Sequence, residues 1–461
     1  MGCRRGADLP NGPVCRVWRG TEIRTGRNSP MVCNERDYIM TLIDRRSFLA
    51  SAAAASAALS APMVAAQGRP RVIVIGGGAG GATAARYIAK DSDGAIDVTL
   101  IEPTRTYYTC FFSNLYLGGF WEYENLGHSY GALASEYGIN VVHDWAIGVD
   151  RDAKTVSLAG GHSLPYDRLV IAPGIDFVEG SVAGWDLSKQ NAMPHAYKAG
   201  SQTQLLKHQI ETMPEGGTFA MVAPPNPYRC PPGPYERVSM VAHVLKERNP
   251  TAKILILDPK PNFSKRALFE DGWNRHYAGM IDWVGPDFGG AEVEVRPDQM
   301  EVLIDGEAES VDVCNVIPAQ QAGRIAHLAG VTNEAGWAPV TPTDMRSRVD
   351  DNIFVLGDSS HQGAMPKSGF SANSQAKVAA NNVRADLTDS RVFPARFSNT
   401  CWSLIAAEDG VKVGASYEPG EDRIESVSSF ISQVGEDADL RRRTFEESVG
   451  WYEGITSDIF G

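Results

Sequence analysis

The stretch RVIVIGGGAGGATAARYIAK, from Arg71 to Lys90, decides the fold. It reads as an apolar strand, a glycine turn and a helix, with Gly76, Gly78 and Gly81 in the G-x-G-x-x-G positions. A second strand, DVTLIEP, follows and ends at Glu102. Such glycines let the backbone approach a pyrophosphate at the helix N-terminus, and the carboxylate accepts hydrogen bonds from a ribose. This order predicts a dinucleotide site, and a purely structural glycine turn is the alternative.

Three features favour FAD over NAD as that dinucleotide. The motif opens the chain after the N-terminal segment, as it does in flavoproteins with two dinucleotide-binding domains. The strand YDRLVIAPGID, which contains Gly174, resembles the segment that returns the chain to a flavin domain. The strand NIFVLGDSSH ends in Gly357 and Asp358, and in such flavoproteins this aspartate contacts the ribityl chain. An ordinary strand-end turn is the alternative for the Gly-Asp pair.

A second strand–turn–helix–strand unit lacks a phosphate loop. Its strands are GTFAMVAP and AKILILDP, and its helix pattern is VSMVAHVLKER, from Val238 to Arg248. The intervening turn, PNPYRCPPGPYE, has Gly233 as its only glycine and carries five prolines. Proline has no backbone N–H, and a phosphate cradle depends on those donors. The sequence therefore predicts a second Rossmann-like domain without a nicotinamide nucleotide site.

The same turn places a thiol where that phosphate would lie. Cys230 precedes the helix start, which can lower a thiol pKa, and Glu236 follows six residues later. A buried structural cysteine is the alternative. In an exported protein, a cysteine in a proline-stiffened turn at the switch point of a flavin fold favours redox chemistry.

Four other residues are candidates for the same chemistry or its surroundings. Cys110 lies among aromatic residues in TYYTCFFSNLYLGG, and Cys401 lies in SNTCWSLIAAEDG. A helix beginning near Gly369, with Lys367 beside it, would direct its N-terminus at negative charge developing on a flavin. The alternative is a solvated lysine before a packing helix. Cys314, in the apolar pattern VDVCNVIPA, is expected to pack as a small hydrophobe.

The stretch MTLIDRRSFLASAAAASAALSAPMVAAQ, from Met40 to Gln67, reads as an export signal. It has paired Arg45 and Arg46, an alanine-rich apolar region and small residues near Ala66. The RRSFL run matches the twin-arginine signal, which predicts a periplasmic protein. A membrane-anchoring helix is the alternative, although the Ala/Ser region is weakly apolar. Met40 is also a candidate first residue, because the preceding residues have no hydrophobic period.

Composition excludes some classes of partner. The chain has 461 residues, of which 43% are hydrophobic and 21% charged, as expected of a soluble protein with several domains. Without residues 1–66 it keeps 34 basic and 51 acidic side chains, a net charge of −17. This charge argues against a nucleic-acid partner, which needs a basic surface. The exported part keeps four cysteines, which allow three complete pairings, and the residues alone do not choose among them.

The chain from Arg71 onward resembles the flavoprotein subunit of flavocytochrome c sulfide dehydrogenase, including related flavoproteins of sulfur-oxidation gene clusters. The matching runs include YYTC-x-FSNLYLGG, CPPGPYER, NVIPAQQAG, MPKSGFSANSQAKVAA and SNTCWS. The resemblance implies an α/β flavoprotein of the glutathione-reductase type with two dinucleotide-binding domains and an α+β C-terminal interface domain. The expected parts are an upstream segment with its signal, a first FAD part, a second Rossmann-like domain, a second FAD part and a C-terminal flavocytochrome-type domain, at 1–66, 67–180, 181–319, 320–392 and 393–461.

The resemblance also implies roles for particular residues. Cys110 would carry FAD through a thioether, although Phe111 stands where the family has a proline. Cys230 and Cys401 would form a redox disulfide beside the flavin, with Glu236 as its acid/base and Lys367 stabilising the reduced flavin. Sulfide would open the disulfide, and electrons would pass through FAD to a haem. The chain contains no C-x-x-C-H, so that haem would belong to a c-type cytochrome partner.

Two other functions stay open at this stage. One is a membrane sulfide:quinone oxidoreductase, which needs an apolar C-terminal membrane surface that the charged tail does not indicate. The other is a flavoprotein that activates a sulfur-carrier complex without turning over sulfide. A pyridine-nucleotide disulfide reductase is disfavoured, because it needs an intact second phosphate loop and a closely spaced cysteine pair. No stable membrane insertion is expected.

Overall fold

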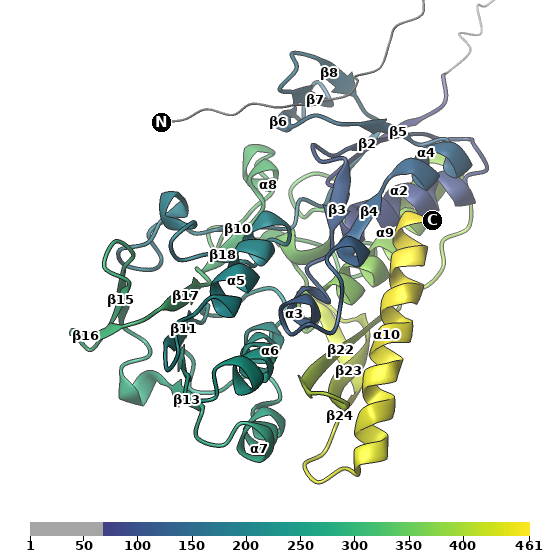
Figure 1. The fold of residues 1–461 in the computed structure, drawn as a ribbon. Coiled ribbons are helices and arrows are strands. Elements are labelled where there is room, and N and C mark those ends of the chain that lie inside the picture. Colours follow the sequence, from purple (N-terminus) through teal and green to yellow (C-terminus); the bar gives the residue numbers. More distant parts are fainter. Residues whose placement is uncertain (1–67) are drawn as a thin grey trace, which may run out of the picture. The chain divides into compact units, whose positions relative to one another are not determined.

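The computed structural model describes residues 68–461 (Figure 1). The predicted export signal therefore lies outside the described residues. Within residues 68–461, none of the helices combines the length and apolar character that a membrane crossing needs.

The first sheet is a parallel layer built around the glycine motif. Its order is β20-β9-β1-β2-β5, and every pair in it is parallel. Strands β1, β2, β9 and β20 are mostly buried and apolar, as expected of a sheet covered on both faces, whereas the edge strand β5 is partly exposed. They are β1 (Arg71–Ile75), β2 (Asp97–Ile101), β5 (Asn140–Val142), β9 (Arg168–Ile171) and β20 (Ile353–Val355), with helices α2 (Ala79–Asp91), α4 (Gly131–Tyr137) and α9 (Gly369–Thr388). The chain thus leaves this sheet after β9 and returns to it at β20.

The second sheet is also parallel and has the order β13-β12-β11-β17. Its strands and helices are β11 (Thr218–Val222), β12 (Lys253–Leu257), β13 (Ile281–Val284), β17 (Val313–Val316), α5 (Ser201–Glu211), α6 (Gly233–Arg248) and α7 (Arg266–His276). Helix α6 begins five residues before the predicted start at Val238. Prolines at its first positions are compatible with a helix start, because those N–H groups have no intrahelical partner. The earlier start places Glu236 in the first helical turn.

The C-terminal part is an antiparallel sheet with a long helix. Strands β22 (Phe397–Ala406), β23 (Asp409–Pro419) and β24 (Ile424–Ile431) pair in that order. Helix α10 (Ala438–Phe460) runs beside them, and Figure 1 shows it in yellow along this sheet. Strand β22 also lies against α6 and α9, so it brings the C-terminal part to both Rossmann-like layers.

Shorter elements connect these layers. The remaining strands are β3 (Thr106–Tyr108), β4 (Gly127–Ser129), β6 (Ala146–Asp150), β7 (Thr155–Leu158), β8 (Ser163–Pro165), β10 (Ile175–Phe177), β14 (Val293–Arg296), β15 (Glu301–Ile304), β16 (Glu307–Ser310), β18 (Gln320–Ala322), β19 (Ala338–Pro339) and β21 (Ser360–His361). The remaining helices are α3 (Ser113–Leu117) and α8 (Arg324–Leu328), with 3-10 turns at Glu124–Leu126, Leu187–Lys189, Pro286–Phe288 and Gly357–Ser359.

Candidate functional site

A long cleft follows the carboxyl ends of β1, β2, β9 and β20. Its volume of about 820 Å³ lies within the range of about 300–1,000 Å³ that is common for ligand sites. Ligands of open parallel sheets bind at this edge. Seven of the eight predicted cofactor residues line the cleft: Gly76, Gly78, Glu102, Cys110, Gly174, Gly357 and Asp358.

The eighth residue, Gly81, has a packing role. A Cβ atom on Gly81 would lie 1.8 Å from the carbonyl oxygen of Gly76, so only glycine lets α2 approach the turn this closely. Gly76 itself has φ +99°, and a Cβ there would lie 2.4 Å from the carbonyl oxygen of Ala172. Helix α2 has no side-chain cap and no acidic residue in its first turn. Its N-terminus therefore faces the cleft with backbone donors, which suits a pyrophosphate.

Glu102 follows β2 at the edge of the cleft. One carboxylate oxygen accepts a hydrogen bond from the Gly77 N–H at 2.8 Å. The other accepts from the backbone N–H of Thr104 at 2.9 Å and from its hydroxyl at 2.7 Å. The turn thus fixes the carboxylate beside the glycines, where the motif places the ribose of a dinucleotide.

Asp358 gives the clearest indication that the cleft accommodates a ligand hydroxyl. Its Oδ1 atom is buried and has no hydrogen-bond partner, while Oδ2 lies 3.8 Å from a guanidinium nitrogen of Arg229. Burial raises the pKa of this carboxyl, and the charges of Arg229 and Lys367 oppose that rise. An unpartnered buried acceptor is costly, so a ligand hydroxyl in the cleft would stabilise it. The ribityl chain of FAD presents such hydroxyls, and the cleft residues therefore fit this cofactor.

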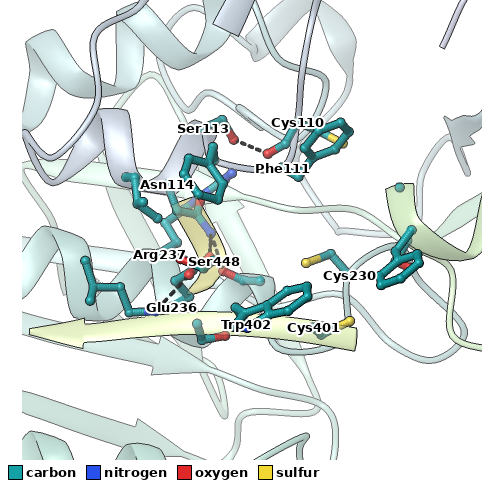
Figure 2. Close-up of a pocket in the computed structure, with 18 of the residues that line it drawn as sticks. Cys110, Phe111, Ser113, Asn114, Cys230, Glu236, Arg237, Cys401, Trp402 and Ser448 are labelled. Atoms are coloured by element: carbon teal, nitrogen blue, oxygen red, sulfur yellow. Dashed lines mark hydrogen bonds between the residues drawn. The ribbon is translucent and has the colours of Figure 1, made fainter. Parts of the chain in front are cut away.

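A second, smaller cavity adjoins the cleft and contains three of the four described cysteines (Figure 2). The two cavities share five lining residues: Cys110, Phe111, Arg229, Ser368 and Gly369. Cys230, Cys401 and Glu236 line the smaller one only. Its space for water-sized molecules is about 80 Å³, several times the roughly 10–15 Å³ that one water needs. We call it the sulfur cavity; it admits a small ligand beside the thiols but not a dinucleotide.

Cys230 lies in the turn between β11 and α6. It has φ +57°, its N–H donates to the Lys367 carbonyl at 2.7 Å, and its carbonyl accepts from the Gly233 N–H at 2.7 Å. Burial raises the pKa of its thiol, and the neighbouring Cys401 and Glu236 raise it further. The expectation of a lowered pKa is therefore wrong, because the negative neighbours and the loss of water outweigh the helix N-terminus.

Cys401 reaches the same cavity from β22. Figure 2 shows Cys401 on this strand and close to Cys230, whereas Cys110 lies farther from both. The amide of Asn399 donates to its Sγ at 3.3 Å. Burial raises the pKa of the Cys401 thiol, and this amide and the ammonium of Lys265 oppose the rise. In the described residues both cysteines are free thiols.

Glu236 on α6 is hydrogen-bonded to α3 and to β22, which also line the sulfur cavity. Its Oε2 accepts from the Asn114 amide at 2.9 Å, and its Oε1 accepts from the Leu404 N–H at 3.0 Å. Burial raises the pKa of this carboxyl, which these hydrogen bonds and the charges of Lys265 and Arg237 partly offset. A buried carboxyl with a raised pKa is suited to exchange a proton with a ligand in the cavity.

Lys367 lines neither cavity. Its ammonium donates to the carbonyls of Asp358 at 2.8 Å and Ser360 at 2.7 Å, and it lies 3.7 Å from the centre of the Trp337 ring. Burial lowers its pKa to about 7, which Asp358 opposes. The following helix begins at Gly369, as predicted. The direct contact of Lys367 with the cofactor stays a prediction, and its visible role is to position the Asp358 turn.

Sequence reasoning missed three polar residues of this site. Asn114 donates to both Glu236 and the Gly233 carbonyl, and Arg229 lines both cavities. Asn114 lies in the stretch that contains Cys110, and Arg229 lies in the turn that contains Cys230. Their closeness in sequence to these cysteines could have indicated that they belong to the site. Lys265 lies between β12 and α7, and its Nζ donates to the Cys401 carbonyl at 3.1 Å. No motif marks it, because only the fold brings it to β22. Cys314, by contrast, is fully buried in β17, as expected.

Three family models match successive parts of the chain. They are "Pyridine nucleotide-disulphide oxidoreductase" over residues 70–202, "Sulfide dehydrogenase [flavocytochrome c] flavoprotein chain, central" over 203–318, and "Flavocytochrome c sulphide dehydrogenase, flavin-binding" over 394–460. The sulfide dehydrogenase flavoprotein chain of Chlorobaculum thiosulfatiphilum is 53% identical over 47 residues, which is 10% of this chain and 96% of that sequence. The chain belongs to the flavocytochrome c sulfide dehydrogenase flavoprotein family.

More distant relatives agree with this family's fold. A sulfide-quinone reductase of Aquifex aeolicus is 24% identical over 412 residues, covering 82% of this chain and 90% of that one. The solved structure of the sulfide:quinone oxidoreductase from Aquifex aeolicus has a TM-score of 0.64 at 20% identity, covering 85% and 92% of the two chains. The predicted fold of two dinucleotide-binding domains is confirmed, and the chain is a flavoprotein oxidoreductase.

Replacing Asp358 tests the fit of the cleft to FAD. In a Cys110→Ala background, which removes any covalent link, Asp358→Ala should weaken FAD binding about 10- to 100-fold, because one hydrogen bond to a charged group is lost. Fluorescence titration of the flavin-free protein measures the dissociation constant. Asp298→Ala, an exposed position outside both cavities, is the control. Equal affinities in both variants would contradict the assignment.

Proposed function

We propose that this chain is a sulfide dehydrogenase flavoprotein that oxidises sulfide at a Cys230–Cys401 disulfide and passes electrons through FAD to a c-type cytochrome. The observation that carries the proposal is the set of residues that together line the sulfur cavity. Two cysteines from separate elements and a buried carboxyl line a space that adjoins the cofactor cleft. Family membership and the sulfide-quinone reductases among the relatives support sulfide as substrate.

The size and chemistry of the sulfur cavity favour a small sulfur anion. Attack by HS⁻ on the disulfide forms a new S–S bond on one cysteine and breaks the bond between the two. The electron pair of the broken bond remains on the other cysteine as a thiolate. The hydrogen of HS⁻ stays on the outer sulfur of the persulfide, so the step balances without a further reactant. Glu236 is suited to accept the proton that H₂S loses when it ionises to HS⁻ in the cavity.

The cleft residues would hold the cofactor beside the cysteines of the sulfur cavity. When bound, FAD supplies a two-electron acceptor that can release electrons one at a time. The glycine turn would hold the pyrophosphate, Glu102 the ribose and Asp358 the ribityl chain. Cys110 lines both cavities, which supports its proposed role as the thioether link to FAD.

The sequence supports the proposed electron acceptor and compartment. No C-x-x-C-H motif occurs, so we assign the haem to a separate cytochrome subunit. The twin-arginine pattern at Arg45 and Arg46 supports export to the periplasm with the flavin already bound.

A quinone acceptor is the second candidate, and two observations favour it. Curated relatives and a solved structural neighbour are sulfide:quinone oxidoreductases. The second observation concerns the C-terminal tail, whose charged sequence does not indicate an apolar membrane surface. Helix α10 buries Ile455 and Ile459, and four apolar residues on and after edge strand β24 are exposed: Val427, Phe430, Ile431 and Val434.

Steady-state turnover separates the proposed acceptors. The purified mature flavoprotein should reduce cytochrome c in the presence of sulfide and should reduce a soluble quinone analogue at least about tenfold more slowly. Quinone reduction as fast as cytochrome reduction would overturn the proposed acceptor. No turnover with either, with and without the cytochrome subunit, would favour an activator of a sulfur-carrier complex and contradict the dehydrogenase proposal.

Replacing one member of the cysteine pair tests the sulfur step. Cys401→Ser should keep FAD bound but prevent its bleaching by sulfide, because no disulfide can form. Stopped-flow absorbance of the flavin measures this, and Cys314→Ser, buried in the second sheet, should bleach at the wild-type rate. Normal bleaching of Cys401→Ser would rule out the proposed pair.

Replacing Cys110 tests the thioether. Acid precipitation of the wild-type protein should leave yellow flavin on the pellet. In Cys110→Ala the flavin should appear in the supernatant, because noncovalent binding is lost on denaturation. Flavin retained on the Cys110→Ala pellet would contradict this link, without affecting the assignment of FAD itself.

A further inference from the structure

Lys265 lies behind the sulfur cavity in an unusual setting for a lysine. It immediately precedes α7, has φ +61° and is only 5% exposed. Its Nζ donates to the Cys401 carbonyl at 3.1 Å and to the Ser403 hydroxyl at 2.8 Å, both on β22. These two bonds join the second Rossmann-like domain to the strand that carries one of the redox cysteines.

The charge of Lys265 has no close counter-ion. Within residues 68–461, no carboxylate oxygen lies within 4.0 Å of its Nζ, and both of its hydrogen-bond acceptors are neutral. Lys260, another buried lysine of the same loop, lies 2.7 Å from the carboxylate of Asp258. Burial of an unpaired ammonium is costly. The fold nevertheless holds this cation directly behind Cys401.

Three titratable groups face Lys265 from three elements. They are Cys401 on β22, Glu236 on α6 and Cys230 in the turn before α6, in order of the strength of their effect. All three become negative when they lose a proton. Arg237, the other cation that acts on Glu236, donates its hydrogen bonds to Asn114, Asn315 and the carbonyls of His195 and Ala196. Lys265 is therefore placed to offset negative charge on Cys401 and Glu236.

We propose that Lys265 is a positioning residue that holds β22 at the sulfur cavity and supplies the counter-charge for thiolate formed there. This inference rests on the proposed function, because opening the disulfide with HS⁻ leaves one thiolate in the sulfur cavity. The ammonium does not take part in the bond changes. It stabilises the electron pair that the broken S–S bond leaves on sulfur, and the Asn399 amide at 3.3 Å from the Cys401 Sγ assists it.

The first test measures the thiol and does not need sulfide. In a Cys230→Ser background, Cys401 is the only thiol of the pair, and its pKa is read from thiolate absorbance and from the pH dependence of alkylation. Adding Lys265→Met should raise that pKa by about 1 unit or more, because an opposite charge is lost. Lys265→Arg should leave it unchanged or lower it, because the guanidinium stays charged at every pH at which the thiol titrates. Lys260→Met controls for the removal of a buried lysine and should also leave it unchanged.

The second test uses the pH dependence of sulfide bleaching in the full holoprotein. Burial lowers the pKa of Lys265 to about 8, against the effect of Cys401, so the cation is present below that pH and is lost above it. The wild-type rate should therefore decline above about pH 8. Lys265→Arg, which stays charged, should move this decline to higher pH, and Lys265→Met should be slow throughout.

The outcomes separate this inference from the proposed function. An unchanged Cys401 pKa in folded, flavin-bound Lys265→Met would overturn the inference, and so would an equal shift in Lys265→Arg. Should Lys265→Met fail to fold, the Lys265→Arg pH profile decides, and an alkaline limb identical to wild type would also overturn it. A shifted thiol pKa in a protein that never bleaches with sulfide would support the role of Lys265 and contradict the proposed function.

Discussion

The carboxylate of Glu236 joins three separate parts of the chain at one point. It accepts hydrogen bonds from Asn114 on α3 and from the Leu404 backbone on β22, while it lies itself on α6. Removing a carboxylate from water is costly unless donors replace the water. These contacts therefore require the flavin layer, the second Rossmann-like layer and the C-terminal sheet to meet here. The position of the sulfur cavity depends on that requirement.

The turn between β11 and α6 shows how a fold can be kept while its site changes. In a nucleotide-binding domain this turn offers backbone N–H groups to a phosphate. Here its prolines remove donors, and its remaining groups face inward. The Cys230 N–H is bound to the Lys367 carbonyl, and the Tyr228 hydroxyl to the Pro231 carbonyl. The turn presents the thiol of Cys230 and the guanidinium of Arg229 to the sulfur cavity, and the first turn of α6 adds the carboxyl of Glu236.

Local pattern was enough to predict the two dinucleotide-binding layers and most of the cofactor cleft, whereas the C-terminal domain was expected only from the family resemblance. The glycine turn, Glu102 and the Gly357–Asp358 turn each follow a strand in a recognisable order, because parallel strands fix where their ends lie. The sulfur cavity was only half predictable. Cys401 lies on a strand that reaches α6 from the far end of the chain, and its connection to Cys230 came from resemblance.

Physical effects that depend on burial were the least predictable. The pKa of Cys230 is raised where the helix start suggested lowering, because the sequence does not reveal how deeply the sulfur is buried beside Cys401 and Glu236. Lys265 was not predicted as a site residue, because the sequence does not reveal its burial and a lysine in a loop is usually solvated. Lys367 was recognised, but its ammonium is bound to carbonyls of the Asp358 turn and does not reach the cavity.

The central claim is that Cys230 and Cys401 form a disulfide in the working protein. Counting thiols in the denatured mature protein, purified without reductant, tests it most directly. Four cysteines remain after residue 67: Cys110, Cys230, Cys314 and Cys401. The account predicts one reactive thiol, from Cys314, before reduction and three afterwards, with Cys110 alkylated by FAD throughout. A count that does not rise by two on reduction would contradict it.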